Sequence, residues 1–221
     1  GMALRDRPRD DYVISTKVGR LMEPDAGVRP GECGWADPLP FRPHYDYTYG
    51  GILRSHAPME PGPAEMLAAV NYSLAERRIE GQFVSLIYAL WNDENRTLQV
   101  ANSGLPRPVY CRKGKTQLIE ATGLPLGLFD DAEYDEVTFQ AEPEDVFVFF
   151  SDGILDATNR AGDLFGRTRL EKVVTECSKN SVESIVKSVF KAAAEHASGV
   201  ETFDDQTVVA IKVKASSSKR K

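Results

Sequence analysis

The sequence predicts an α+β fold in which helices cover a sandwich of antiparallel sheets. Strand-like segments over residues 82–91 and 97–102 are joined by a short polar turn, which is the pattern of a β-hairpin. The segment Val146–Phe150 is almost entirely apolar, so we expect a central strand buried on both faces. Helical periodicity follows over residues 167–177 and 181–196. Segments of both kinds in one chain fit helices packed on sheets.

The chain changes character near residue 57. Before this point, residues 12–18 are predicted to form a strand that ends at Gly19. Residues 23–49 follow as an irregular stretch, rich in Pro, Gly, Trp and Tyr, without a regular apolar period. Loops of that length are uncommon inside a compact domain and usually belong to a functional site or a displaced segment. We therefore expect residues 1–57 to be a separate, partly irregular segment.

Residues 58–214 show clearer periodicity. Residues 58–63 are expected to be a linker, because Pro63 suits the first turn of a helix. That helix is predicted over residues 64–80, where apolar residues recur on one face before Gly81. Shorter strands complete the prediction, at residues 109–112, 116–120, 136–141 and 207–213.

The composition is that of a globular protein with a sizeable core, since 42% of the 221 residues are hydrophobic and 27% are charged. The net charge of -6 disfavours binding to nucleic acid or to an anionic membrane, and no apolar stretch approaches the ~20 residues that span a bilayer. No signal peptide is visible, and three widely spaced cysteines argue against a disulfide framework or a zinc site. We therefore expect a cytoplasmic protein whose residues 215–221 form a disordered basic tail.

Two acidic motifs stand at the ends of predicted strands. Asp152-Gly153 follows the buried strand directly, with Asp156 close behind, and Asp204-Asp205 precedes the last strand. Mg²⁺ and Mn²⁺ prefer a few carboxylate oxygens and keep several waters, and a Gly beside a carboxylate lets backbone and water approach closely. Taken singly, Asp-Gly is also a common turn and Asp-Asp a common solvated loop. Their joint occurrence, separated by two predicted helices, favours a cation site.

Four segments of residues 58–214 follow a pattern in a fixed order. They are residues 63–74 (P-A-E-M-L, then N-Y-S-L), 123–127 (G-L-P-L-G), 152–166 (D-G-I-L-D-A-T-N-R-A-G-D-L-F-G) and 204–207 (D-D-Q-T). In these motifs the chain resembles the C-terminal part of bacterial SpoIIE-like, PP2C-type (PPM) serine/threonine phosphatases.

The resemblance implies a PP2C-like β-sandwich and a metal-dependent hydrolysis of phosphoserine or phosphothreonine in a bacterial regulatory protein. It implies two Mn²⁺ or Mg²⁺ ions, with Asp152 and Asp204 as ligands and Asp205 as a further carboxylate of the metal site. Gly153 and Asp156 would support that site. The implied partner is a phosphoprotein substrate.

Two features depart from the family pattern. The G-D-x-x-D and D-G-x-G-H motifs, which the family has in the earlier half of its domain, are absent from this chain. Asp46 lies in the segment that is most similar to the G-D-x-x-D motif. Leu105 stands where the family usually has His. These departures leave open a second interpretation, in which the chain is a catalytically inactive phosphatase-like or binding domain.

Residues 12–20 (Y-V-I-S-T-K-V-G-R) and parts of 40–55 carry a different pattern. They resemble an early part of aldo-keto reductases that act on sugars, in which the strand lysine, here Lys17, helps to polarise a carbonyl. The chain is too short for a barrel of ~250 residues, so the resemblance implies a chimera rather than an oxidoreductase. The strand at 12–18 is expected to fill an open edge of the phosphatase sheet, and an edge left open would favour a homodimer.

Overall fold

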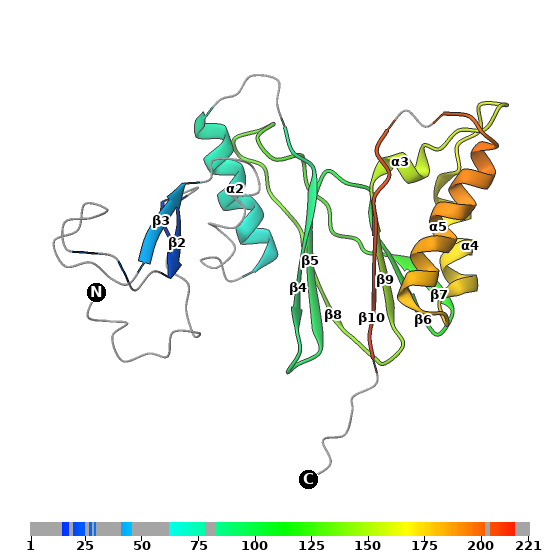
Figure 1. The fold of residues 1–221 in the computed structure, drawn as a ribbon, viewed down its shortest axis with the longest axis horizontal. Helices are drawn as coiled ribbons and strands as arrows, with labels where there is room; N and C mark the ends of the chain where they lie inside the picture. Colours follow the sequence, from blue (N-terminus) through cyan, green and yellow to red (C-terminus); the bar gives the residue numbers. More distant parts are fainter. Residues whose placement is uncertain are drawn as a thin grey trace, which may run out of the picture.

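The computed structural model describes residues 15–17, 20–24, 27, 29, 41–45, 62–77, 83–201 and 204–214. Within these residues the main body has four layers, with helix α2, two antiparallel sheets and the helix pair α4–α5 stacked in that order (Figure 1).

The two sheets of this body have the strand orders β4-β5-β8 and β10-β9-β6-β7. The strands of the first sheet are β4 Leu86–Asn92, β5 Thr97–Ser103 and β8 Glu136–Gln140. Those of the second sheet are β6 Val109–Arg112, β7 Lys115–Leu118, β9 Val146–Phe150 and β10 Val208–Lys212. Helix α2 is Pro63–Arg77, α4 is Gly166–Cys177 and α5 is Val182–Ala197.

Apolar side chains fill each of the three interfaces between the layers. Val100 of β5 and Phe147 of β9 belong to the core between the two sheets. Val148 of β9 and Leu170 of α4 belong to the core between the second sheet and its helices, and Leu67 anchors the core beneath α2. Because consecutive residues of β9 enter two different cores, this strand is buried on both faces, as its apolar sequence predicts.

The predicted α+β sandwich with helices on its sheets is confirmed, and β6 and β9 have the predicted bounds. The predicted helix over 64–80 is α2, of which residues 78–80 lie outside the described residues. The hairpin strand predicted from residue 82 begins only at Leu86, and Val84 instead makes an isolated bridge to Leu126.

The N-terminal strands form a sheet of their own, with the order β1-β2-β3. They are β1 Ser15–Lys17, β2 Arg20–Pro24 and β3 Phe41–Tyr45. The prediction that the strand within 12–18 completes the phosphatase sheet is therefore wrong for β1, which pairs with β2. A partner that follows within a few residues closes a short loop, and this costs less chain entropy than pairing with a distant sheet edge.

The prediction of a wholly irregular stretch over 23–49 is also wrong, because β3 lies within it and pairs with β2. Pro43 conceals this strand in the sequence, since a proline cannot donate to the ladder and is tolerated mainly at sheet edges, which is where β3 lies. Asp46, residues 58–61 of the predicted linker and the tail 215–221 lie outside the described residues.

Two of the sequence motifs meet through Asn71, a buried residue of α2. Its side-chain amide donates to the carbonyl oxygen of Phe129 (2.8 Å), and its side-chain oxygen accepts from the N–H of Gly127 (2.8 Å). Gly127 has a φ of 79°, a left-handed conformation that favours glycine. The helix of the first motif thus fixes the G-L-P-L-G turn of the second.

Tyr134 gives a prediction about alkaline stability. Its hydroxyl is buried without a hydrogen-bond partner in the described part of the chain, and burial raises its pKa to about 12. Because the pKa is about 10 in an unfolded chain, the folded state holds this proton more tightly, and the resulting stability is present below pH ~10 and lost as the pH rises toward ~12. Tyr134→Phe should leave stability at pH 7 unchanged or slightly higher and reduce the alkaline loss.

Urea unfolding at several pH values between 7 and 11.5 measures both effects. Tyr110→Phe is the matched control, because the Tyr110 hydroxyl donates to Asp145 (3.1 Å) and its removal should destabilise the fold at pH 7. A Tyr134→Phe variant that is less stable than Tyr110→Phe at pH 7 would contradict this account.

Candidate functional site

The exit of strand β9 is bonded directly to the loop before β10. Ser151, the residue after β9, donates its backbone N–H to the carbonyl oxygen of Thr207 (3.1 Å) and its hydroxyl to that of Asp205 (2.8 Å). The same hydroxyl accepts from the N–H of Thr207 (2.9 Å). Because β9 and β10 pair along their length, the Asp152-Gly153 and Asp204-Asp205 motifs are brought together from distant parts of the sequence.

Gly153 is the point of closest approach between the two motifs. A Cβ atom on Gly153 would lie 2.5 Å from the carbonyl oxygen of Asp205 and 3.2 Å from that of Asp204. The side chain of Gln206 adds a hydrogen bond to the carbonyl oxygen of Gly153 (2.9 Å). Glycine is required here because the loop before β10 lies against the short helix α3 (Asp152–Leu155), which the sequence did not predict.

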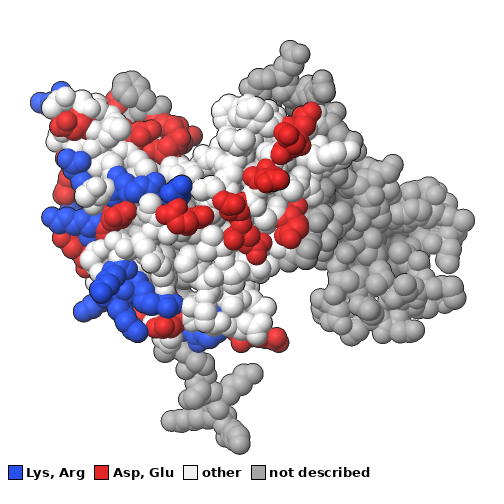
Figure 2. Space-filling view, turned by 180° about the vertical axis from the view of Figure 1, so that it is seen from behind, with Lys and Arg blue, Asp and Glu red and all other residues white. Residues whose placement is uncertain are grey.

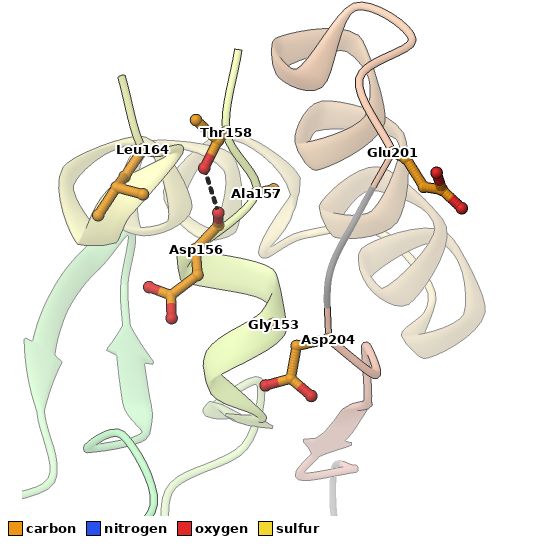
Figure 3. Close-up of a pocket in the computed structure, with 7 residues that line it drawn as sticks. All are labelled: Gly153, Asp156, Ala157, Thr158, Leu164, Glu201 and Asp204. Carbon is orange, nitrogen blue, oxygen red and sulfur yellow. Dashed lines mark hydrogen bonds between the residues drawn. The ribbon is translucent and has the colours of Figure 1, made fainter. Parts of the chain in front are cut away.

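A pocket of about 370 Å³ opens beside α3 (Figure 3). Asp156 lies at the C-terminal end of α3, and Asp204 comes from the loop before β10. Glu201 contributes a third carboxylate, which points away from the other two in Figure 3. The full set of lining residues is Gly153, Asp156, Ala157, Thr158, Leu164, Glu201 and Asp204.

The predicted site residues divide into two groups. Asp204, Gly153 and Asp156 line the pocket, whereas Asp152 and Asp205 are exposed beside it. Asp152 accepts from the N–H of Gly153 (3.1 Å) and Asp204 from that of Asp205 (2.8 Å), each through one carboxylate oxygen. The predicted metal-binding roles of Asp152, Asp204 and Asp205 stay predictions.

The charge around the pocket favours cations. Three of the seven residues that line it are acidic, namely Asp156, Glu201 and Asp204, and none is Lys or Arg. Figure 2, seen from behind relative to Figure 1, shows a separate group of acidic side chains at the centre right, on the side of helix α2 and not of the pocket, while most Lys and Arg side chains gather on the left. A phosphate dianion would be repelled from the pocket's carboxylates unless a cation lay between them.

The donor set suits a hydrated cation better than a closed metal cage. Within the described ranges, no group of three or more His, Cys, Asp or Glu side chains could hold a metal ion. Asp156 and Asp204 are nevertheless the kind of ligand that Mg²⁺ uses, because this ion is often held by one or two carboxylates and keeps several waters. The residues present therefore fit a weakly held, largely hydrated ion.

Sequence reasoning missed part of the pocket wall. Leu164 belongs to the 152–166 motif but carries no ionisable group, and Glu201 lies outside every motif, so neither gives a chemical signal. Leu105, which replaces the family's usual His, does not line the pocket. Its turn is closed by Asn102, whose side chain accepts from the N–H of Leu105 (3.0 Å) and donates to its carbonyl oxygen (2.8 Å).

The fold is that of the PP2C-type phosphatases. The chain superposes on the PP2C phosphatase domain of SpoIIE from Bacillus subtilis, solved with a fragment of its regulatory domain, with a TM-score of 0.65 and 16% identity, covering 75% of this chain and 49% of that one. A manganese-presoaked structure of the SpoIIE phosphatase domain gives a TM-score of 0.58 and 16% identity, covering 92% of this chain and 93% of that one.

Residues 48–214 match the family described as Stage II sporulation protein E (SpoIIE), and the chain belongs to this family. The match begins before the predicted boundary at residue 58. Among curated proteins, the chain is 27% identical over 154 residues to the phosphoserine phosphatase RsbU of Bacillus subtilis, covering 69% of this chain. The match spans 45% of RsbU, less than half of that protein.

A shorter match bears on residues 1–57. The chain is 42% identical over 64 residues to pyridoxal 4-dehydrogenase of Microbacterium luteolum, covering 25% of this chain and 18% of that enzyme. So short and partial a match does not establish a fusion with a reductase, and the predicted chimera stays a prediction. The side chain of Lys17 lies outside the described residues.

Proposed function

We propose that this chain is a protein phosphatase domain that hydrolyses phosphoserine or phosphothreonine esters of a bacterial regulatory protein, with Mn²⁺ or Mg²⁺ as cofactor. The observation that carries the proposal is the junction of two acidic motifs at one pocket, held by the bonds of Ser151 and the close approach at Gly153. Membership of the SpoIIE family and the likeness to RsbU support the same reaction.

In this proposal Asp204 and Asp156, which both line the pocket, hold the cation, and Asp152 and Asp205, adjacent to these segments in the chain, are the further carboxylates. A bound divalent ion lowers the pKa of its water and neutralises charge on phosphoryl oxygens. The chain's own part is to orient the carboxylates on the rigid end of β9 and to keep the 204–205 backbone against Gly153. Because the pocket is acidic, phosphoester binding depends on the cation.

The proposal also includes a partner, a cellular location and an oligomeric state. The partner is a phosphoprotein substrate, the location is the cytoplasm, and a homodimer through a sheet edge stays a prediction. Across the described helices, none is long and apolar enough to cross a membrane.

A second candidate is a phosphatase-like domain without catalysis. It is favoured by the lack of a three-ligand group in the part of the chain that the structure describes and by the missing G-D-x-x-D and D-G-x-G-H motifs. Such a domain would keep the fold and the acidic pocket but would hold the cation too weakly to act on a phosphoester.

Hydrolysis of p-nitrophenyl phosphate separates the two candidates. The proposal predicts turnover that requires Mn²⁺ and falls at least about 100-fold in Asp204→Asn, because even outer-shell changes around a metal often cost roughly 10–100-fold. Asp131→Asn, an exposed aspartate outside the pocket, is the matched control and should retain full activity. A rate that neither responds to Mn²⁺ nor changes in Asp204→Asn would establish the non-catalytic domain instead.

A further inference from the structure

One wall of the pocket is apolar. Leu164 is its exposed apolar side chain, beside the nearly buried Ala157 (2% exposed), Thr158 and the carboxylate of Asp156. The Leu164 side chain is 51% exposed. A single exposed leucine is ordinary on a protein surface, so its meaning depends on how firmly it is held and on what it faces.

The segment that carries Leu164, residues 157–165, is held by its own hydrogen bonds, and we call it the pocket loop. Phe165 donates its N–H to the carbonyl oxygen of Ala157 (2.7 Å), and Thr158 forms an isolated bridge with Leu164. At the tip, the side-chain oxygen of Asn159 accepts from the N–H groups of Ala161 and Asp163, both at 2.9 Å. The loop is therefore ordered without help from a ligand.

The pocket loop is also fastened to the helices behind it. Arg169 of α4 donates to the carbonyl oxygens of Leu164 and Phe165, both at 3.0 Å. His196 of α5 bonds the carbonyl oxygen of Asp163 (2.9 Å), and its ring lies edge-on to the buried ring of Phe165. Leu164 is thus presented at a fixed place, and a partner that contacts it has no loop to order on binding.

The geometry points to Leu164 as a specificity-determining residue, which contacts an apolar side chain directly next to the phosphorylated residue of the substrate. This inference rests on the proposed function and adds the class of substrate: a phosphoserine or phosphothreonine flanked by a residue such as leucine. A cation held by the pocket's carboxylates would take the phosphoryl group, and the adjacent residue would then lie against Leu164, which lines the same pocket.

An apolar neighbour suits this wall better than a polar one of equal size. An asparagine beside the phosphoresidue would lose water from its amide against Leu164 and Ala157, which supply no side-chain hydrogen bond. A leucine there would instead remove apolar surface from water on both sides of the contact. Because Leu164 is already about half buried before a peptide binds, only part of its surface can be removed from water by the contact. We therefore expect the leucine peptide to bind about fivefold more tightly than the asparagine peptide, a difference of about 1 kcal/mol in binding free energy.

The test uses fluorescein-labelled peptides with one phosphoserine in a Gly-Ala background and either Leu or Asn on its N-terminal or C-terminal side. Binding is measured by fluorescence anisotropy with the full chain and Mn²⁺. The Leu peptide should bind about fivefold more tightly than its Asn counterpart in at least one of the two positions. In Leu164→Asn this ratio should fall below about twofold, and in Leu128→Asn, a leucine equally exposed (48%) but outside the pocket, it should stay unchanged.

The outcomes separate this inference from the proposed function, which Mn²⁺-dependent hydrolysis of p-nitrophenyl phosphate by the unmodified chain tests independently. Equal binding of the Leu and Asn peptides, or a preference that survives in Leu164→Asn, overturns the role of Leu164. No peptide binding in a chain that hydrolyses p-nitrophenyl phosphate overturns the inference alone. A peptide preference that depends on Leu164, in a chain that does not hydrolyse p-nitrophenyl phosphate, supports the inference and refutes catalysis. If neither the preference nor the hydrolysis is observed, the inference and the proposed function are both refuted.

Discussion

Replacing Asp145 by alanine is expected to lower the free energy of unfolding by about 3 kcal/mol, because it removes the buried partner of an ion pair whose other side chain, Arg112, is 33% exposed. Asp145 is only 1% exposed and lies directly before the central strand β9. Arg112 of β6 donates to it twice, from Nη2 at 2.7 Å and from Nε at 3.0 Å. These bonds raise the pKa of Arg112 above its ordinary value. Because a guanidinium is protonated at neutral pH without any partner, Arg112 stays charged when Asp145 is gone.

The same carboxylate accepts two more hydrogen bonds. The Tyr110 hydroxyl donates to it at 3.1 Å and the N–H of Glu142 at 2.7 Å, so truncation leaves several donors without a partner at once. Arg112 keeps its exposed ion pair with Glu142 (3.1 Å) and its bond to the carbonyl oxygen of Gln140 (2.8 Å), which limits the loss. We therefore expect a loss at the lower end of the range of about 3–5 kcal/mol for a broken buried pair.

Urea unfolding measures this loss. Glu120→Ala is the control, because Glu120 pairs with Arg107 at 2.6 Å but both side chains are well exposed (62% and 44%). Removing an exposed pair should cost less than about 1 kcal/mol. Equal effects of the two substitutions would show that burial does not set the strength of the Asp145 network.

Those parts of the fold that depend on local pattern could be predicted from the sequence. The run Val146–Phe150 has no polar residue, so only a strand buried on both faces could accommodate it. The long helix α5 follows the apolar period predicted over residues 181–196, and in the structure the hydroxyl of Ser181 caps it by accepting from the N–H of Ser184. In each case one dominant physical effect acts within a single segment.

The parts that depend on contacts between distant segments could not be predicted. Taken singly, Asp152-Gly153 fits a turn as well as part of a cation site, whereas the structure forms α3 there, with Gln206 of the loop before β10 bonded to Gly153. The family resemblance implies only a supporting role for Asp156, whereas the structure places it in the lining of the pocket together with Asp204. Sequence spacing identifies which carboxylates are available, but only the fold decides which of them face one cavity.

Gly153→Ala is expected to have the largest effect on the site. The added methyl group would lie 2.5 Å from the carbonyl oxygen of Asp205, and backbone on a paired strand end cannot move aside as a flexible side chain could. Overpacking of this kind typically costs about 1–3 kcal/mol. The loop before β10 would have to leave α3, which would separate Asp204 from Asp156. Gly114→Ala is the control for a glycine replaced outside the pocket: no atom lies within 4 Å of its Cβ position, and its φ of 77° makes the substitution strain the backbone without a clash at the site.

Broadening of backbone amide signals by Mn²⁺, in nuclear magnetic resonance spectra of the ¹⁵N-labelled chain, tests most directly whether the two acidic segments share one cation. In the unmodified chain and in Gly114→Ala, amides of residues 152–157 and 204–207 should broaden together as Mn²⁺ is added, because the paramagnetic ion lies close to both. In Gly153→Ala the joint response should be lost. Broadening of one segment alone in the unmodified chain, or of neither, would contradict a shared cation site and with it the phosphatase proposal.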